Sequence, residues 1–302
     1  MTMVSRSAAR DAGAATGSLP LPDSEDATPN AKLVRVEGGR GWAAGLPDVW
    51  TYREVMYLLL IRNLKIHYRQ AALGASWAVL QPLALMGVLL LVAHVLIQVP
   101  SEGVPYPLYA FTALAVWTLF VQSLTVASES IVRDMNLVSK VYVPRLIIPL
   151  AAIGALLVDF VIALGIVFLL MALYSKAPGL EALAWTPAIA LLALAVCVAV
   201  GVWLSALMVM YRDIRWVVPL LTLVWFLATP VAYPATLVPP DWRLLYGLNP
   251  MAGVVEGFRS ALLGTNPPAT GMLAVSAAVT VLLLVGAFTY FRRVDRIFAD
   301  VI

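Results

Sequence analysis

Residue types that support catalysis are scarce in this chain of 302 residues. None of its four lysines directly follows a glycine, so the GxxxxGK[ST] loop that binds nucleotide phosphates is absent. His67 and His94 lack the i, i+4 spacing of a helical metal site, and Cys197 is the only cysteine. We therefore expect no metal or other cofactor bound by this chain, no ATP hydrolysis through such a loop, and no enzymatic activity.

Three charged residues in apolar surroundings are candidates for a function. Asp159 interrupts an apolar block at 146–175, where an unpaired charge would cost several kcal/mol if the block crossed a membrane. We consider two roles for it, a hydrogen-bond partner inside a helix bundle and a group on a substrate path. Glu256 and Arg259 are three residues apart, which is typical of a pair on a helix surface. A contact at an external gate is the alternative.

The elements that must position these residues are long and apolar. Hydrophobic residues make up 62% of the chain and charged residues 12%. Six stretches approach or exceed the roughly 20 residues that an α-helix needs to cross a bilayer, and lipid permits only helices here. The sequence thus predicts an all-α integral membrane protein with one transmembrane domain, 47–302. The predicted spans are about 71–98, 108–129, 146–174, 184–210, 216–234 and 269–291.

The basic residues indicate an orientation. Counted at the predicted span ends, the cytoplasmic side carries Arg53, Arg62, Lys65, Arg69, Arg133, Lys140, Arg145, Arg212, Arg215, Arg292, Arg293 and Arg296, against Lys176, Arg243 and Arg259 outside. The positive-inside rule then predicts that both termini are cytoplasmic. The net charge of +3 and the pI near 9.0 therefore reflect topology, and we expect no nucleic-acid partner.

Four further segments lie outside these spans. Residues 1–46 are polar, without a helical stripe, and are expected to be a disordered cytoplasmic tail. Residues 47–69 alternate apolar and basic faces, which predicts an amphipathic interface helix in the headgroup plane. An extension of the first span is the alternative. Residues 130–145 predict a charged cytoplasmic element, and the proline-rich 235–263 predicts short helices that enter the outer leaflet and return.

Aromatic residues have two possible placements. Some lie near span ends, as in an interfacial belt. Others have flat faces suited to the C–H surfaces of sugars and are candidates to line a pore. These channel candidates are Trp77, Tyr106, Tyr109, Phe120, Trp225 and Tyr233.

Several blocks together resemble a known family. They are TYREVMYLLLIRNLKIHYRQAALGASWAVLQPL after Trp50, then VPYPLYAFTALAVWTLF, NLVSKVYVPRLIIPL, MYRDIR and LNPMAGVVEGFRSALLG. In this order they resemble the type-2 ABC exporter permeases for polysaccharides, the family of Wzm, KpsM and TagG, with Wzm the most similar. The resemblance covers about residues 47–296 and leaves the N-terminal tail outside the shared pattern.

The resemblance implies a function and partners. Such permeases form homodimers in the bacterial cytoplasmic (inner) membrane and pair with two copies of a separate Wzt-like ABC-type ATPase, which binds ATP and Mg. The implied cargo is a polysaccharide of O-antigen, capsule, teichoic-acid or galactan type on a polyprenyl pyrophosphate carrier. The 130–145 element corresponds to the coupling helix that contacts the ATPase. Its candidate coupling residues are Arg133, Asp134, Met135, Asn136, Leu137 and Lys140.

Basic groups near the predicted inner gate suit that cargo. Arg62, Lys65 and Arg69 are candidates to bind the pyrophosphate oxygens, with membrane lipid headgroups as the equally simple partner.

Two rival functions remain open at this point. A type-2 ABC permease for a drug or small lipid shares the spans, but usually not the NPMAGVVEGFR-like block. An intramembrane polyprenyl-phosphate-using glycosyltransferase would need acidic and basic residues clustered at one membrane face. The acidic residues of this chain are scattered instead.

Overall fold

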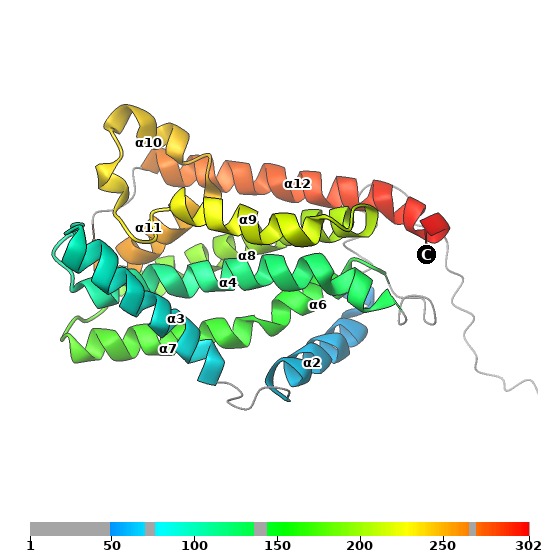
Figure 1. The fold of residues 1–302 in the computed structure, drawn as a ribbon, viewed down its shortest axis with the longest axis horizontal. Helices are drawn as coiled ribbons and strands as arrows, with labels where there is room; N and C mark the ends of the chain where they lie inside the picture. The colour runs from blue at the N-terminus through cyan, green and yellow to red at the C-terminus, as the bar shows by residue number, and fades with distance from the viewer. Residues whose placement is uncertain (1–48, 70–75, 136–143, 266–269, 302) are drawn as a thin grey trace, which may run out of the picture. The chain divides into compact units, whose positions relative to one another are not determined.

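The computed structural model describes residues 49–69, 76–135, 144–265 and 270–301, and this part of the chain is helical without strands. The predicted tail 1–46 therefore lies outside the described residues. Figure 1 shows the helices in chain order. They are α2 (Arg53–Arg69), α3 (Ser76–Leu89), the π-helix η1 (Leu90–Leu96), α4 (Tyr106–Arg133), α6 (Ile147–Ala155), α7 (Leu157–Leu173), α8 (Leu180–Met210), α9 (Ile214–Leu227), the 3-10 helix η2 (Ala235–Leu237), α10 (Pro240–Tyr246), α11 (Pro250–Leu263) and α12 (Thr270–Val301).

Five segments among the described residues are long and apolar enough to cross a membrane: Val79–Leu96, Tyr106–Arg133, Ile147–Leu173, Ala184–Met210 and Gly271–Asp295. They correspond to the first, second, third, fourth and sixth predicted spans. The all-helical membrane class is thereby confirmed.

The fifth predicted span differs from its prediction. Helix α9 covers 14 residues and ends at Leu227, seven residues before the predicted end at 234. Thr229 precedes Pro230, and a residue before proline is disfavoured in the helical conformation. The chain therefore leaves the helix at Ala228 and continues through turns to η2.

Helix α4 lies at the centre of the bundle. Its side chains are buried along most of its length, and it packs against α3, α6, α7, α8, α9 and α11. Small residues allow this close packing. A Cβ atom added at Gly201 of α8 would lie 3.0 Å from both the Ala127 Cβ of α4 and the Ile153 Cδ1 of α6. Three helices therefore meet closely at this glycine.

The third span is interrupted at Leu156, which separates α6 from α7. The Leu156 amide donates to the carbonyl of Ile153, three residues back, at 3.0 Å, so the chain makes one tighter turn there. We call this interruption the joint. It places Asp159 in the first turn of α7.

Helix α2 packs along α6, beside which Figure 1 shows it. The buried Leu59 forms a cluster with Ile147, Ile148 and Ala151, and Val49, Tyr52, Val55, Met56 and Leu60 pack against this cluster. The predicted apolar face is therefore used against another helix of the same chain. The position of α2 in the headgroup plane remains a prediction.

The segment predicted to re-enter the membrane contains three short helices, η2, α10 and α11. Asn249 caps α11 by accepting a hydrogen bond from the Met251 amide at 3.1 Å, and Pro250 is its first residue. Gly264 ends the helix in the left-handed conformation, with φ of 64°. Helix α11 packs against α4, α8 and α12.

Candidate functional site

The C-terminal end of α4 brings two predicted site residues together. Arg62 of α2, predicted at the gate, forms an ion pair with Asp134, which follows α4 and was predicted to couple to an ATPase. The Asp134 side chain is 11% exposed and the Arg62 side chain 36%. The Arg62 guanidinium is therefore partly neutralised by Asp134 and is not available to a ligand alone.

The other predicted residues of this region differ in their placement. Lys65 and Arg69 are exposed on α2, Arg133 is exposed and Met135 is half-buried. Asn136, Leu137 and Lys140 lie outside the described residues. The grouping of a complete coupling surface thus stays a prediction.

Two further ion pairs join helices near the same end. Arg215 lies 3.4 Å from Glu129 of α4, and both side chains are largely exposed. Arg145 donates to Asp295 of α12, at 2.9 Å to the backbone carbonyl and 3.2 Å to the carboxylate. An exposed pair such as Arg215 with Glu129 contributes about 0–1 kcal/mol.

Asp159 binds two residues of α2. His67 Nε2 lies 3.0 Å from one carboxylate oxygen, and the Tyr68 hydroxyl donates to the other. Burial, and then the hydrogen bond and charge of Asp159, raise the pKa of the Tyr68 phenol, so this group stays protonated and acts as a donor. Asp159 is 8% exposed. Of its two predicted roles, these contacts favour the one inside the helix bundle.

The interpretation of Glu256 and Arg259 as a helix-surface pair is wrong. Arg259 is fully buried and Glu256 is 4% exposed. Arg259 Nη1 donates to the Glu256 carboxylate at 3.2 Å. The remaining acceptors of Arg259 are the backbone carbonyls of Pro230 at 2.6 Å, Val231 at 2.5 Å, Tyr233 at 3.3 Å and Tyr109 at 3.3 Å.

Two more contacts complete this buried cluster. The Arg259 guanidinium lies 3.7 Å from the centre of the Tyr109 ring, a cation–π distance. Glu256 accepts a hydrogen bond from the Ala235 amide at 3.0 Å. Arg259 and Glu256 together therefore hold the N-terminal part of α4 and the α9–α10 connection against α11. We call these residues the Arg259 cluster.

Three of the six channel candidates do not face an open path in this structure. Tyr106, Tyr109 and Phe120 are buried between helices, so their prediction as channel residues is wrong here. The physical reason is that α4 is enclosed on nearly all sides.

The other three candidates are placed differently. Trp225 is half-buried and donates to the Asn249 side chain at 2.8 Å, and the half-buried Tyr233 shares a hydrogen bond of 2.9 Å with Tyr246. Trp77 lies in α3, and its side chain is not among those described.

Asn249 is a site residue that the sequence analysis missed. Besides capping α11, it donates to the Ala228 carbonyl at 2.9 Å and to Thr229 Oγ1 at 3.0 Å. An asparagine directly before a proline at a helix start is a recognisable capping signal. The signal predicts the cap, but not the contacts with α9.

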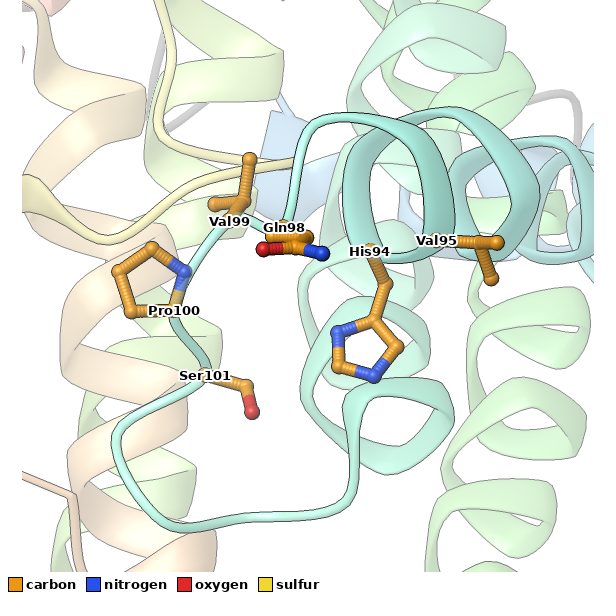
Figure 2. Close-up of a pocket in the computed structure, with 6 residues that line it drawn as sticks. All are labelled: His94, Val95, Gln98, Val99, Pro100 and Ser101. Carbon is orange, nitrogen blue, oxygen red and sulfur yellow. The ribbon is translucent and has the colours of Figure 1, made fainter.

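A surface hollow of about 480 Å³ adjoins η1. His94, Gln98 and Ser101 contribute its polar groups, and Figure 2 shows them around the turn that follows η1. The His94 ring stacks on Tyr106, with centroids 4.9 Å apart. Within the described part of the chain, no three His, Cys, Asp or Glu residues are grouped to hold a metal ion.

The model of one family, described as ABC-2 type transporter, matches residues 54–263, which is more than half of the chain. The chain belongs to the ABC-2 type transporter family. It is thus the membrane subunit of a transporter, a multi-pass membrane protein, and its family implies a partner ABC ATPase.

Three curated relatives of this ABC-2 transporter cover most of its length. The O-antigen export system permease protein RfbA of Myxococcus xanthus is 29% identical over 256 residues, which is 84% of this chain and 97% of the relative. A protein of the same name from Klebsiella pneumoniae is 22% identical over 251 residues, 82% of this chain and 95% of the relative. A second one from Klebsiella pneumoniae is 22% identical over 210 residues, 70% of this chain and 80% of the relative.

The matched range of this ABC-2 transporter contains the contacts described above. Arg62 with Asp134, Asp159 with α2, and the whole Arg259 cluster lie within residues 54–263. Helix α12, with Asp295, lies entirely beyond it.

Proposed function

We propose that this ABC-2 transporter chain is the permease subunit of an ATP-driven polysaccharide exporter. Its cargo would be an O-antigen, capsule, teichoic-acid or galactan polymer joined to polyprenyl pyrophosphate, moved from the cytoplasm across the bacterial inner membrane. The observation that carries the proposal is that three relatives, aligned over 70–84% of this chain, are all named O-antigen export permeases.

The proposed topology has six crossings and cytoplasmic termini. Five segments have the length to cross, and α9 would make the remaining crossing. Its 14 residues extend over about 21 Å, so the turns after Leu227 would complete the path across about 30 Å of hydrocarbon. Helices α10 and α11 would then enter the outer leaflet and return. The basic residues at 212 and 215 support a cytoplasmic position for the start of α9.

The proposed assembly is a homodimer with two copies of a Wzt-like ATPase. The 130–145 element would contact the ATPase, with Asp134 at its start already paired to α2. ATP binding would close the two ATPase subunits and move this element. The helix bundle would respond by opening a path for the lipid carrier first and the glycan afterwards.

The proposed headgroup site is on α2. Lys65 and Arg69 are exposed there, so their charges are available to pyrophosphate oxygens, whereas Arg62 is engaged by Asp134. Trp225 and Tyr233 are the half-buried aromatic candidates that remain for contacts with sugar rings.

Deletion of the gene in its native host tests the proposal. We expect surface polysaccharide to disappear and lipid-linked polymer to accumulate in the cytoplasm. Complementation with the intact gene should restore the surface polymer. Normal surface glycan in the deletion strain, together with increased sensitivity to an exported drug, would overturn the proposal in favour of a small-molecule permease.

A second test concerns the energy source. The purified dimer with its ATPase, reconstituted in vesicles, should export glycan with ATP and not with a non-hydrolysable nucleotide. Equal export with both nucleotides would contradict the proposed mechanism.

A further inference from the structure

Helix α2 is attached to the rest of the protein at three places that belong to different elements. Leu59 packs on Ile147, Ile148 and Ala151 of α6, before the joint. His67 and Tyr68 bind Asp159 of α7, after the joint. Arg62 binds Asp134, directly after α4. One uninterrupted helix of 17 residues therefore contacts both sides of the joint and the end of α4.

The contact before the joint is tight and apolar. A Cβ atom added at Gly154 would lie 3.0 Å from Leu60 Cδ1, so α2 and α6 approach closely two residues before Leu156. Packed apolar surfaces of this kind do not deform continuously. Helix α2 and helix α6 are therefore expected to move together.

The contact after the joint is polar and buried. Asp159 lies 12 residues beyond Ile147, well inside the third predicted span. At that depth in a predicted span, a carboxylate needs partners, and α2 supplies a hydroxyl and an imidazole. Movement of α2 together with α6 would therefore act on α7 through this contact.

Asp159 also has other polar groups nearby. Gln122 and Thr118 of α4 line the same small cavity as Asp159, together with Pro82 of α3. An amide and a hydroxyl are thus adjacent to the carboxylate on the side of α4. When the α2 contact is lost, these groups of α4 still line the same cavity as the carboxylate, so α7 keeps polar neighbours that do not depend on α2.

We propose that α2 transmits movement of the coupling element to the third span, with Asp134 and Asp159 as its two polar attachment points. Arg62 follows Asp134 when the end of α4 moves. Helix α2 then carries α6 through Leu59 and α7 through His67 and Tyr68, so that both sides of the joint move with it. In this scheme, which rests on the proposed ATP-driven function, Asp159 is a positioning residue and does not touch the cargo.

The first test compares ATP hydrolysis with export in the same vesicles. The full permease–ATPase complex is reconstituted with Asp159→Asn, Tyr68→Phe or His67→Gln. We expect the complexes to assemble and ATP turnover to stay within about twofold of the wild type, while glycan exported per ATP falls about fivefold or more. A purely structural defect would lower ATP hydrolysis and glycan export together. It would therefore leave the amount of glycan exported per ATP unchanged.

The matched control is Glu129→Gln, which removes an exposed ion pair at the same end of α4. It should leave glycan exported per ATP unchanged. The swapped pair Arg62→Glu with Asp134→Arg should recover more of the ratio than either single change. An unchanged ratio in all three Asp159-contact variants, or an equal fall of hydrolysis and export, would overturn the proposal.

The second test needs no cargo, so it separates this proposal from the proposed function. Spin labels are placed at Tyr57→Cys on α2 and Phe168→Cys on α7, both exposed positions, in a Cys197→Ala background. We expect the distance between the two labels of one protomer, measured after dilution with unlabelled permease, to remain single and narrow with and without a non-hydrolysable ATP analogue, and to become broad in Asp159→Asn. A distance that is equally narrow in Asp159→Asn would overturn the attachment. Wild-type complexes that pass this test but export no glycan would contradict only the proposed function.

Discussion

At the C-terminal end of α4, Arg62 with Asp134 and Arg215 with Glu129 join helices through side chains that water still reaches. Near the N-terminal end of α4, Arg259 is enclosed and donates to four backbone carbonyls and one carboxylate. Partners of the first kind can be exchanged, because water and other side chains can replace them. Partners of the second kind cannot, because a buried charge without them is strongly unfavourable. The C-terminal end of α4 is therefore suited to movement, and its N-terminal end to rigidity.

The largest expected effect concerns the Arg259 cluster. Arg259→Met should destabilise the protein by about 3–5 kcal/mol, because Glu256 stays buried without its partner. We expect little folded protein in the membrane and a strongly lowered midpoint of thermal unfolding in detergent.

The double variant Glu256→Gln with Arg259→Met should be more stable than Arg259→Met alone, because no unpaired buried charge remains. Arg215→Gln, at the other end of the bundle, is the control arginine. Wild-type stability of Arg259→Met would contradict the comparison between the two ends.

The next effect concerns Asn249, which belongs to the same rigid region. Asn249→Ala removes the α11 cap and the hydrogen bonds to Trp225, Ala228 and Thr229, at an expected cost of about 2 kcal/mol. Asn249→Asp keeps the cap acceptor and should lose less. Thermal unfolding of both variants measures the difference, and equal stability of the two would show that the hydrogen bonds donated to Ala228 and Thr229 outweigh the cap.

A comparable effect is expected at Gly253, where α11 meets α12. A Cβ atom there would lie 2.6 Å from the Ser276 Cβ, and Ser276 is itself held by a hydrogen bond of 3.0 Å to the Gly247 carbonyl. Gly253→Ala should cost about 1–3 kcal/mol. The matched control is Gly165→Ala in α7. A Cβ atom added there would meet no atom of a neighbouring element within 4 Å, so this variant should be neutral or slightly stabilising. Similar unfolding midpoints for the two alanine variants would contradict this packing.

The smallest effect is expected at the exposed pair. Arg215→Gln or Glu129→Gln should change the free energy of unfolding by no more than about 1 kcal/mol. For each variant, the unfolding curve at low salt should nearly coincide with the curve at high salt. Salt screens most of an exposed ion pair, and each variant lacks this pair. A loss of several kcal/mol would place this pair with the rigid end and remove the contrast.

The sequence predicted the long apolar helices well, because their length and lack of charge are local properties. It also contained the reason for the early end of α9, since Pro230 is visible after Thr229. The joint has no such signal at Leu156, because the proline nearest to it on the N-terminal side, Pro149, lies within α6.

Long-range pairings were beyond sequence reasoning. Asp159 was recognisable as an unusual carboxylate, but its partners His67 and Tyr68 lie more than 90 residues earlier in the chain. Glu256 and Arg259 have the spacing of an exposed pair, and charged residues are mostly exposed. Only the surrounding carbonyls, supplied by α4 and the α9–α10 connection, make their burial possible.

The order of Arg259 and its carbonyl acceptors in the chain has a consequence for biosynthesis. The ribosome completes residues 109 and 230–233 before it reaches 259, so these acceptors emerge before their donor. A nascent chain stopped before this arginine would contain the earlier helices but not the group that unites them. Final closure of that region is therefore expected only after α11 has left the ribosome, late in synthesis and membrane insertion.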